Sequence, residues 1–126
     1  MKDDSAYLRH ILECIRRVEE DTLEGRAKFM RVHTLQDAVL RNLQTMSEST
    51  QLLSDKHKAA HPEIEWRRIA AFRNLLVHNY LGIDLGKVWE IVHRDVPALK
   101  AAAEAMLRDL ERTPRQFPKG DPHDPS

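Results

Sequence analysis

A basic segment in the second half of the chain holds the residues best suited to chemistry. From Trp66 to Tyr80 the charged side chains are Arg67, Arg68 and Arg73, with no acidic residue among them. The whole chain is different, because its 20 Lys and Arg balance its 20 Asp and Glu to a formal net charge of zero. Proteins that hold long nucleic acids by bulk electrostatics carry a strong basic excess, so any nucleic-acid contact must be local here. The segment predicts a local anion-binding site.

Helical spacing decides which of these side chains can act together. Asn74 and His78 are four residues apart and share a helix face, whereas Arg73 and Tyr80 are seven apart and nearly eclipse each other. Arg73 and His78 are five apart and point about 140° from each other in a regular helix. They can converge on one ligand if the helix loosens near Gly82, or if two symmetry-related helices contribute to one cleft. The sequence leaves both arrangements open.

Long helices are expected to position this segment, because the body of the chain has few turn residues. Four of the six prolines and one of the four glycines lie between residues 113 and 126. We therefore expect one helical domain over residues 1–112, and a Pro-rich disordered tail over residues 113–126. The predicted fold class is all-α, an up-and-down bundle of four to five helices.

Apolar residues at intervals of three and four place these helices. The expected helices cover residues 8–18, 32–53, 66–81, 85–92 and 96–110. The first is expected to have Asp4 or Ser5 as its N-cap, and the second is the longest and stops before Pro62. The fourth starts behind Asp84, and Pro97 falls in the first turn of the fifth, where proline is tolerated.

The third of these helices is apolar over a wider arc than one bundle face can cover. Its core stripe consists of Ile69, Phe72, Leu76 and Tyr80. Leu75 lies to one side of this stripe, and Val77 and Leu81 lie to the other. The spare apolar surface predicts a partner, most simply a second copy of the chain.

Several classes of protein and site are not expected. No apolar run approaches the ~18 residues that a membrane helix needs, and the first residues contain no secretory signal, so we expect a cytoplasmic protein. Cys14 is the only cysteine, which excludes an intramolecular disulfide and a cysteine-based zinc cluster. His57, His61 and Glu65 recur at intervals of four, but Pro62 interrupts the helix that would align them, so no metal site is expected.

Residues 73–80 match the Arg-x4-His-x-Tyr motif, and here the chain resembles HEPN domain proteins, specifically the HepT toxin family. Similar flanks are residues 36–43 on the long helix, 61–64 with Trp66, and 82–92. The resemblance covers roughly residues 5–110. In one departure, Ser47-Glu48-Ser49 stands where the family often has Gly-Glu-Ala, which keeps the acid but changes the small residues around it.

The resemblance implies a metal-independent endoribonuclease that needs no cofactor and uses the 2′-hydroxyl of the RNA. An imidazole suits proton transfer near neutral pH, so His78 is the expected general base or acid. Arg73 would bind the scissile phosphate and stabilise its developing charge. Asn74 would orient the imidazole or contact the phosphate, and Glu48 would be a structural partner of an arginine. DNA lacks the 2′-hydroxyl and should remain intact.

The resemblance also implies regulation. The chain would be the toxin of a type VII-like toxin–antitoxin system, acting as a homodimer. In HepT systems a minimal nucleotidyltransferase antitoxin transfers AMP to the motif tyrosine, which is Tyr80 here. A bulky anionic adduct two residues from His78 would occupy the phosphate site and exclude RNA.

Two other functions are considered beside the nuclease. In one, the chain is a non-catalytic helical module that docks the nucleotidyltransferase and accepts AMP without cutting RNA. In the other, it is a helical DNA-binding regulator. The second is disfavoured, because no further helix supplies the basic residues that duplex DNA requires.

Overall fold

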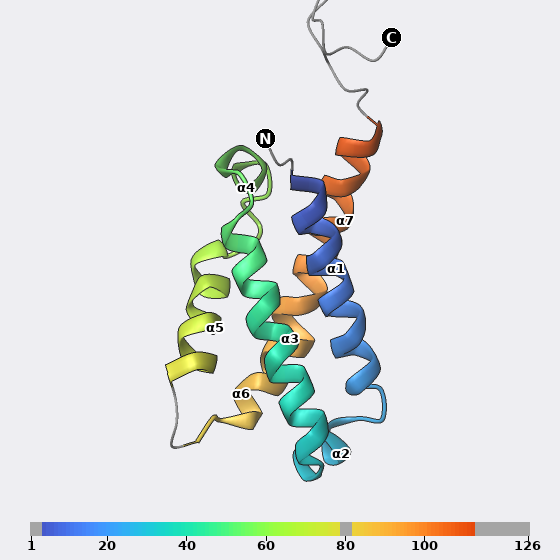
Figure 1. Cartoon of the computed structure of the whole chain (residues 1–126), viewed down its shortest axis with the longest axis vertical. Helices are drawn as coiled ribbons and strands as arrows, with labels where there is room; N and C mark the ends of the chain where they lie inside the picture. The colour runs from blue at the N-terminus through green and yellow to red at the C-terminus, as the bar shows by residue number, and fades with distance from the viewer. Residues whose placement is uncertain (1–3, 79–81, 113–126) are drawn as a thin grey trace, which may run out of the picture.

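The computed structural model describes residues 4–78 and 82–112, with side chains for 4–72 and 82–112, and every element in that part is helical (Figure 1). The elements are α1 (Asp4–Asp21), α2 (Arg26–Arg31), α3 (His33–Gln51), α4 (Asp55–Ala59), α5 (Trp66–His78), α6 (Leu85–Glu90), the π-helical segment η1 (Ile91–Asp95) and α7 (Val96–Arg112). The predicted all-α bundle is confirmed. The tail, residues 113–126, lies outside the described residues.

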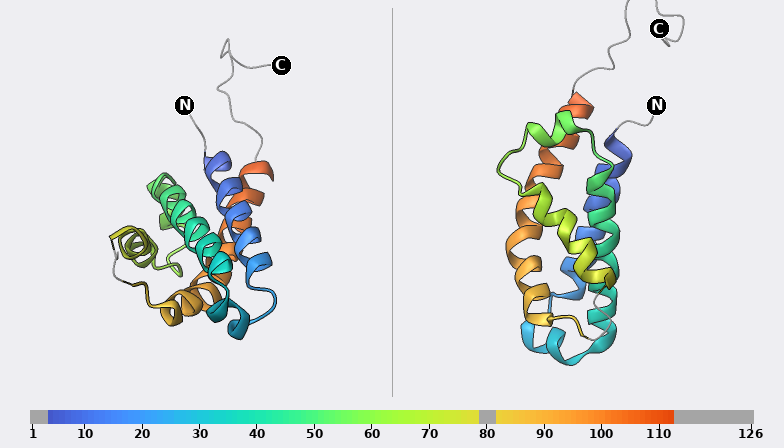
Figure 2. Two further views of the ribbon diagram at one scale, coloured as in Figure 1. Left: turned by 60° about the horizontal axis from the view of Figure 1, so that its bottom comes forward. Right: turned by 90° about the vertical axis from the view of Figure 1, so that its left-hand side faces the viewer.

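Three long helices enclose the core. α1 packs against α3 on one side and α7 on the other, and α5 covers the outer side of α3 (Figures 1 and 2). The apolar side chains with no exposed surface come from α1, α2, α3 and α6: Leu8, Ile11, Ile15, Val18, Phe29, Val39, Leu43 and Val88. Their spacing of three and four along α1 and α3 is the pattern that the sequence shows. Among the described helices, none combines the length and hydropathy that a membrane crossing requires.

The second predicted helix corresponds to α3, with slightly shorter bounds. α3 is the longest element, with 19 residues, as expected, but it ends at Gln51 rather than Leu53. The short α2 and α4 on either side were not predicted, because five or six residues show no clear periodicity. α1 already contains Asp4 and Ser5 in its first turn, so the N-cap prediction is wrong.

The fourth and fifth predicted helices run into one another. Asp84 caps α6 as predicted, and its Oδ1 accepts the backbone N–H of Gly86 at 3.0 Å and of Lys87 at 3.2 Å. The expected connection to α7 is absent, because η1 continues the helix and the Val96 N–H bonds to the Ile91 carbonyl five residues back. This wider turn directly precedes Pro97, which has no N–H to donate.

Candidate functional site

The predicted catalytic residues lie on the second half of α5. Arg73, Asn74 and His78 are within the helix, but their side chains lie outside the described ones, and Tyr80 lies outside the described residues altogether. The structure therefore defines this site through the path of α5 and through its neighbours.

Trp66 anchors the start of α5, which begins at this residue as predicted. Its indole Nε1 donates to the carbonyl of Lys58 at 3.0 Å and to that of His61 at 3.2 Å. The ring is half-buried and packs against the hydrophobic core. These contacts join the first turn of α5 to α4 and the loop after it. Because a tryptophan N–H is a donor only, both bonds depend on one ring orientation.

The rotation of α5 about its axis is set by burial in its first two turns. Ile69 and Phe72 face the core and are 3% and 5% exposed. Arg67 and Ala71 lie on the opposite, exposed side. Asn74 and His78 continue the spacing of Arg67 and Ala71 along the helix. By register, then, these two motif positions follow the exposed face.

Arg73 has a different register position. It lies four residues after Ile69, on the line of the buried stripe rather than on the line of His78. The helix is α-helical through His78, so no loosening brings the two positions together before that residue. Residues 79–81 lie outside the described residues. Gly82 follows with φ of +146°, a backbone conformation that favours glycine.

Glu48 lies on α3, the helix that α5 packs against. The two helices run antiparallel (Figure 1), and Thr50 and Gln51 of α3 line a hollow together with Arg67 and Ala70 of α5. Glu48 is about one turn back from Gln51, so it lies alongside the middle of α5. It is half-buried, and its Oε1 accepts the Gln44 Nε2 at 3.3 Å.

The serines beside Glu48 are buried and satisfied. Ser47 is 0% exposed and its hydroxyl donates to the Gln44 carbonyl at 2.8 Å. Ser49 is 7% exposed and its Oγ lies 2.6 Å from Nδ1 of His10 on α1. The helices thus pack closely around Ser47-Glu48-Ser49, although serines stand here where the HepT family often has glycine and alanine.

The basic character of α5 is smaller than its composition suggests. Nε of Arg68 donates to Oδ1 of Asp95 at 3.0 Å, and the guanidinium lies 5.8 Å from the centre of the Phe72 ring. The hydrogen bond and the charge of Asp95 raise the pKa of Arg68. The predicted excess of three positive charges is therefore overstated by one. Asp95 was missed because it lies 27 residues away, with no local pattern to link it to α5.

A Ser–His–Asp cluster joins α1 to α4 and was also missed. Asp4 Oδ2 accepts the backbone N–H of Ser54 at 3.0 Å, the Ser54 hydroxyl at 2.8 Å, and Nδ1 of His57. Ser54 Oγ lies 3.0 Å from the same Nδ1. A nucleophilic triad needs its serine and its carboxylate on opposite ring nitrogens. This cluster therefore cannot activate Ser54 and serves to hold the two helices together.

The polar contacts of this cluster act on the Asp4 carboxyl. Its side chain is 8% exposed. Burial by itself raises the pKa of Asp4, but hydrogen bonds from His57 and Ser54 outweigh this and lower it. His61 has a different carboxylate partner, Glu63 Oε2 at 2.8 Å from its Nδ1. The two histidines considered above as metal ligands are thus engaged in separate contacts.

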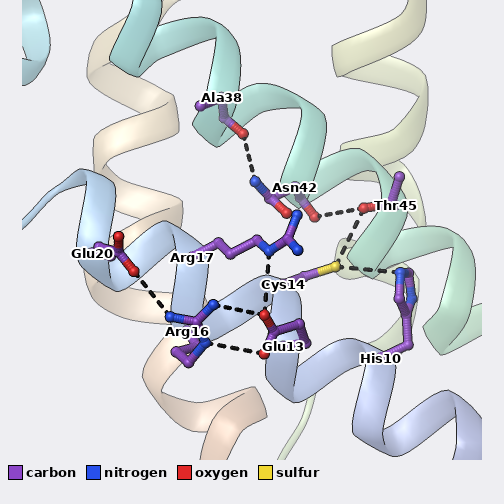
Figure 3. A network of polar contacts seen from close by, with 9 residues as sticks. All are labelled: His10, Glu13, Cys14, Arg16, Arg17, Glu20, Ala38, Asn42 and Thr45. Atoms are coloured by element: carbon purple, nitrogen blue, oxygen red, sulfur yellow. Dashed lines mark hydrogen bonds and ion pairs between the residues drawn. The ribbon is translucent and has the colours of Figure 1, made fainter.

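A second polar network lies between α1 and α3 (Figure 3). The buried Cys14 has its Sγ 3.3 Å from Thr45 Oγ1 and 3.7 Å from His10 Nε2. Burial raises the pKa of this thiol. On the exposed side of α1, the hydrogen bond from Arg16 outweighs the opposing effect of desolvation and lowers the pKa of Glu13 to about 2. The contact of Cys14 with Thr45 joins α1 to α3 and so helps to position the helix that supports α5.

Comparisons with known proteins give a consistent result. A family model described as "Ribonuclease HepT-like" matches residues 11–106. A Thermococcus cleftensis protein named "Probable ribonuclease HepT" is 37% identical over 103 residues, which cover 81% of this chain and 94% of that protein. A Caldanaerobacter subterraneus protein named "Putative RNase" is 30% identical over 112 residues, covering 86% of this chain and 97% of that protein.

A longer relative comes from Methanocaldococcus jannaschii and is named "Gamma-glutamylcyclotransferase and putative RNase". It is 35% identical over 112 residues, covering 88% of this chain but 50% of the relative, so the chain spans half of that protein. No solved structure matches the chain.

Proposed function

The chain belongs to the ribonuclease HepT-like family, and on that premise we propose that it is a metal-independent endoribonuclease. The observation that carries the proposal is the position of the Arg-x4-His-x-Tyr motif. It follows a firmly anchored first turn, on a helix whose exposed face continues in register from Arg67 to His78. A relative that the chain matches over most of its length is named a ribonuclease.

The proposed reaction needs one acid–base group and one phosphate-binding cation. The 2′-oxygen of the RNA forms a bond to phosphorus and the P–O5′ bond breaks, which leaves a 2′,3′-cyclic phosphate and a free 5′-hydroxyl. One proton leaves the 2′-hydroxyl and one is delivered to the departing 5′-oxygen. His78 acts as the general base or the general acid for one of these protons, and Arg73 binds the phosphate and stabilises its charge. Asn74 orients the imidazole or contacts the phosphate. Glu48 holds the motif helix in place.

The active form is proposed to be a homodimer. Arg73 and His78 occupy different sides of a regular helix, about 140° apart. Two copies with facing α5 helices would bring an arginine and a histidine from each helix to one cleft. The dimer would therefore complete the site as well as cover the apolar flanks of α5.

Regulation is proposed to act on Tyr80. The chain would be the toxin of a type VII-like toxin–antitoxin pair that acts on cytoplasmic RNA. A nucleotidyltransferase antitoxin would transfer AMP to the Tyr80 hydroxyl. The added phosphate would compete with the RNA phosphate for the same cations.

The test is cleavage of labelled RNA by the purified chain in EDTA, with a DNA strand of the same sequence beside it. We expect products ending in a 2′,3′-cyclic phosphate from RNA and intact DNA. His78→Ala and Arg73→Ala should each lower the rate about 100-fold or more. The matched control is His33→Ala, which removes an exposed histidine at the start of α3 and should leave the rate unchanged.

Two results would overturn the assignment. Equal rates for His78→Ala and the wild type would remove His78 from the reaction. Intact RNA together with transfer of AMP to Tyr80 would favour the non-catalytic docking module instead. Circular dichroism of each variant shows whether the helices are retained.

A further inference from the structure

We propose that Lys58 and Arg67 form an accessory subsite for a backbone phosphate of the RNA, separate from the scissile phosphate. The inference rests on the proposed function, because it assumes an RNA strand on the exposed face of α5. It adds a second contact point, at the opposite end of α5 from the Arg-x4-His-x-Tyr motif.

The subsite is a hollow where three helices meet. The end of α3, the short α4 and the first turns of α5 surround a cavity of about 180 Å³. Its lining residues are Thr50, Gln51, Lys58, Trp66, Arg67 and Ala70. Pockets for whole small molecules usually measure about 300–1,000 Å³. This hollow therefore suits one group of a ligand that continues outside it, such as a phosphate of a nucleic-acid strand.

The two cations at the hollow are available for a ligand. Within the described part of the chain, neither Lys58 nor Arg67 pairs with a carboxylate, whereas the neighbouring Arg68 is held by Asp95. The acid closest to Arg67 along the chain is Glu65. It lies four residues before the buried Ile69, so its register follows the other side of α5. Adjacent arginines thus differ in whether a protein carboxylate already satisfies them.

The contacts of Trp66 hold these cations in place. Its indole donates to the Lys58 carbonyl at 3.0 Å, which joins the last turn of α4 to the first turn of α5. Lys58 and Arg67 both line the hollow next to this indole. An amide, Gln51, completes the polar lining of the hollow and can donate to phosphate oxygen.

The subsite is in line with the proposed catalytic histidine. Arg67, Ala71, Asn74 and His78 repeat at intervals of four, three and four on one helix face. At 1.5 Å per residue, Arg67 is about 10 Å along the helix from Asn74 and about 16 Å from His78. A single strand lying on this face would place a phosphate at the hollow a few nucleotides from the cut. Phosphate contacts of this kind fix the position of a strand without reading its sequence.

The experiment measures binding rather than cleavage. The full chain with His78→Ala is titrated with a labelled single-stranded RNA at several salt concentrations, alone and with Lys58→Gln, Arg67→Gln or both. We expect each change to weaken binding about threefold to tenfold at low salt and to reduce the salt slope by about 0.7. The double change should reduce the slope by about 1.4. A DNA strand of the same sequence should lose affinity by the same factors.

The matched control is Arg108→Gln on α7, another exposed arginine with no ion pair in the described part of the chain. It removes the same charge away from the hollow, so its binding and salt slope should stay within about twofold of the parent. Equal losses for Arg108→Gln and Arg67→Gln would overturn the subsite, because bulk charge would then explain both. Unchanged binding in the Lys58 and Arg67 variants would overturn it as well.

The outcome separates this inference from the proposed function. If the wild-type chain binds RNA through Lys58 and Arg67 but does not cut it, the subsite stands and the nuclease fails. If the chain cuts RNA at equal efficiency in all variants, the nuclease stands and the subsite fails. If the chain neither binds nor cuts RNA, both are wrong. Thermal melting of each variant checks that folding is intact.

Discussion

The α1–α3 interface and the exposed face of α5 are both rich in polar side chains, but these side chains have different partners. Between α1 and α3, His10 meets Ser49 and Cys14 meets Thr45, so the protein satisfies its own polar groups. On the exposed face of α5, Arg67 has no carboxylate partner among the described residues. Polar groups that are paired inside a protein stabilise its fold, whereas an unpaired cation beside a hollow is free for a ligand. The polar groups between α1 and α3 therefore stabilise the fold, whereas Arg67 is a candidate for binding a ligand.

The largest expected loss of stability comes from the core that both regions share. Leu43→Ala removes a side chain with no exposed surface on α3 and should lower the free energy of unfolding by about 2–5 kcal/mol. The matched control is Leu52→Ala just after α3, where the leucine is 57% exposed. It should change the free energy by less than about 0.5 kcal/mol. Urea unfolding followed by circular dichroism measures both; similar losses would contradict the burial pattern.

The next effect tests a paired polar cluster. Asp4→Asn weakens the charge-assisted contacts to Ser54 and His57 and should cost about 1–3 kcal/mol at neutral pH. Because the folded state lowers the pKa of Asp4 below its ordinary 3.8, this stabilisation is present above pH 3.8 and is lost as the pH falls through the lower, folded-state pKa.

The pH dependence of that variant supplies the check. Unfolding of the wild type and Asp4→Asn is compared from pH 7 to pH 2, and the gap between them should close only at the acidic end. A gap that is constant over the whole range would mean that the Asp4 charge contributes nothing. The nuclease activity proposed for α5 should be unaffected by this change at neutral pH.

A smaller effect should distinguish the two adjacent arginines. Arg68→Gln breaks the ion pair with Asp95, whose Oδ2 is buried with no hydrogen-bond partner in the described part of the chain. The thermal midpoint should fall by a few degrees, because a carboxylate with one buried oxygen is left without its cation. Arg67→Gln should leave the midpoint almost unchanged and weaken RNA binding instead. A lower midpoint for Arg67→Gln together with weaker RNA binding for Arg68→Gln would contradict these different roles.

The smallest effect is expected for an exposed ion pair. Arg9 Nη2 lies 3.5 Å from Glu111 Oε1, and both side chains are more than half exposed. Arg9→Ala should change the free energy of unfolding by less than about 0.5 kcal/mol, since solvent and salt screen such pairs. A loss comparable with that of Asp4→Asn, measured under the same conditions, would show that burial does not decide the value of these contacts.

Local patterns predicted most of the fold. The apolar spacing placed α1, α3 and α7, and the starts of α5 at Trp66 and of α6 behind Asp84 are confirmed. The short α2 and α4 and the fusion of α6 with α7 through η1 escaped prediction. Short helices contain too few residues for a period, and a π-turn depends on hydrogen bonds that no side-chain pattern reveals.

In the candidate site, too, local features could be predicted from the sequence, whereas contacts between distant segments could not. By itself, the sequence determined that Arg73, Asn74 and His78 share one helix and that Arg73 and His78 stand on different sides of it, because helical geometry is local. The tertiary structure alone decided that Arg68 is held by Asp95, whereas Arg67 lies at a hollow with Lys58. Those contacts join segments far apart in the chain. They depend on how the helices pack, and adjacent residues of one type can therefore have unlike roles.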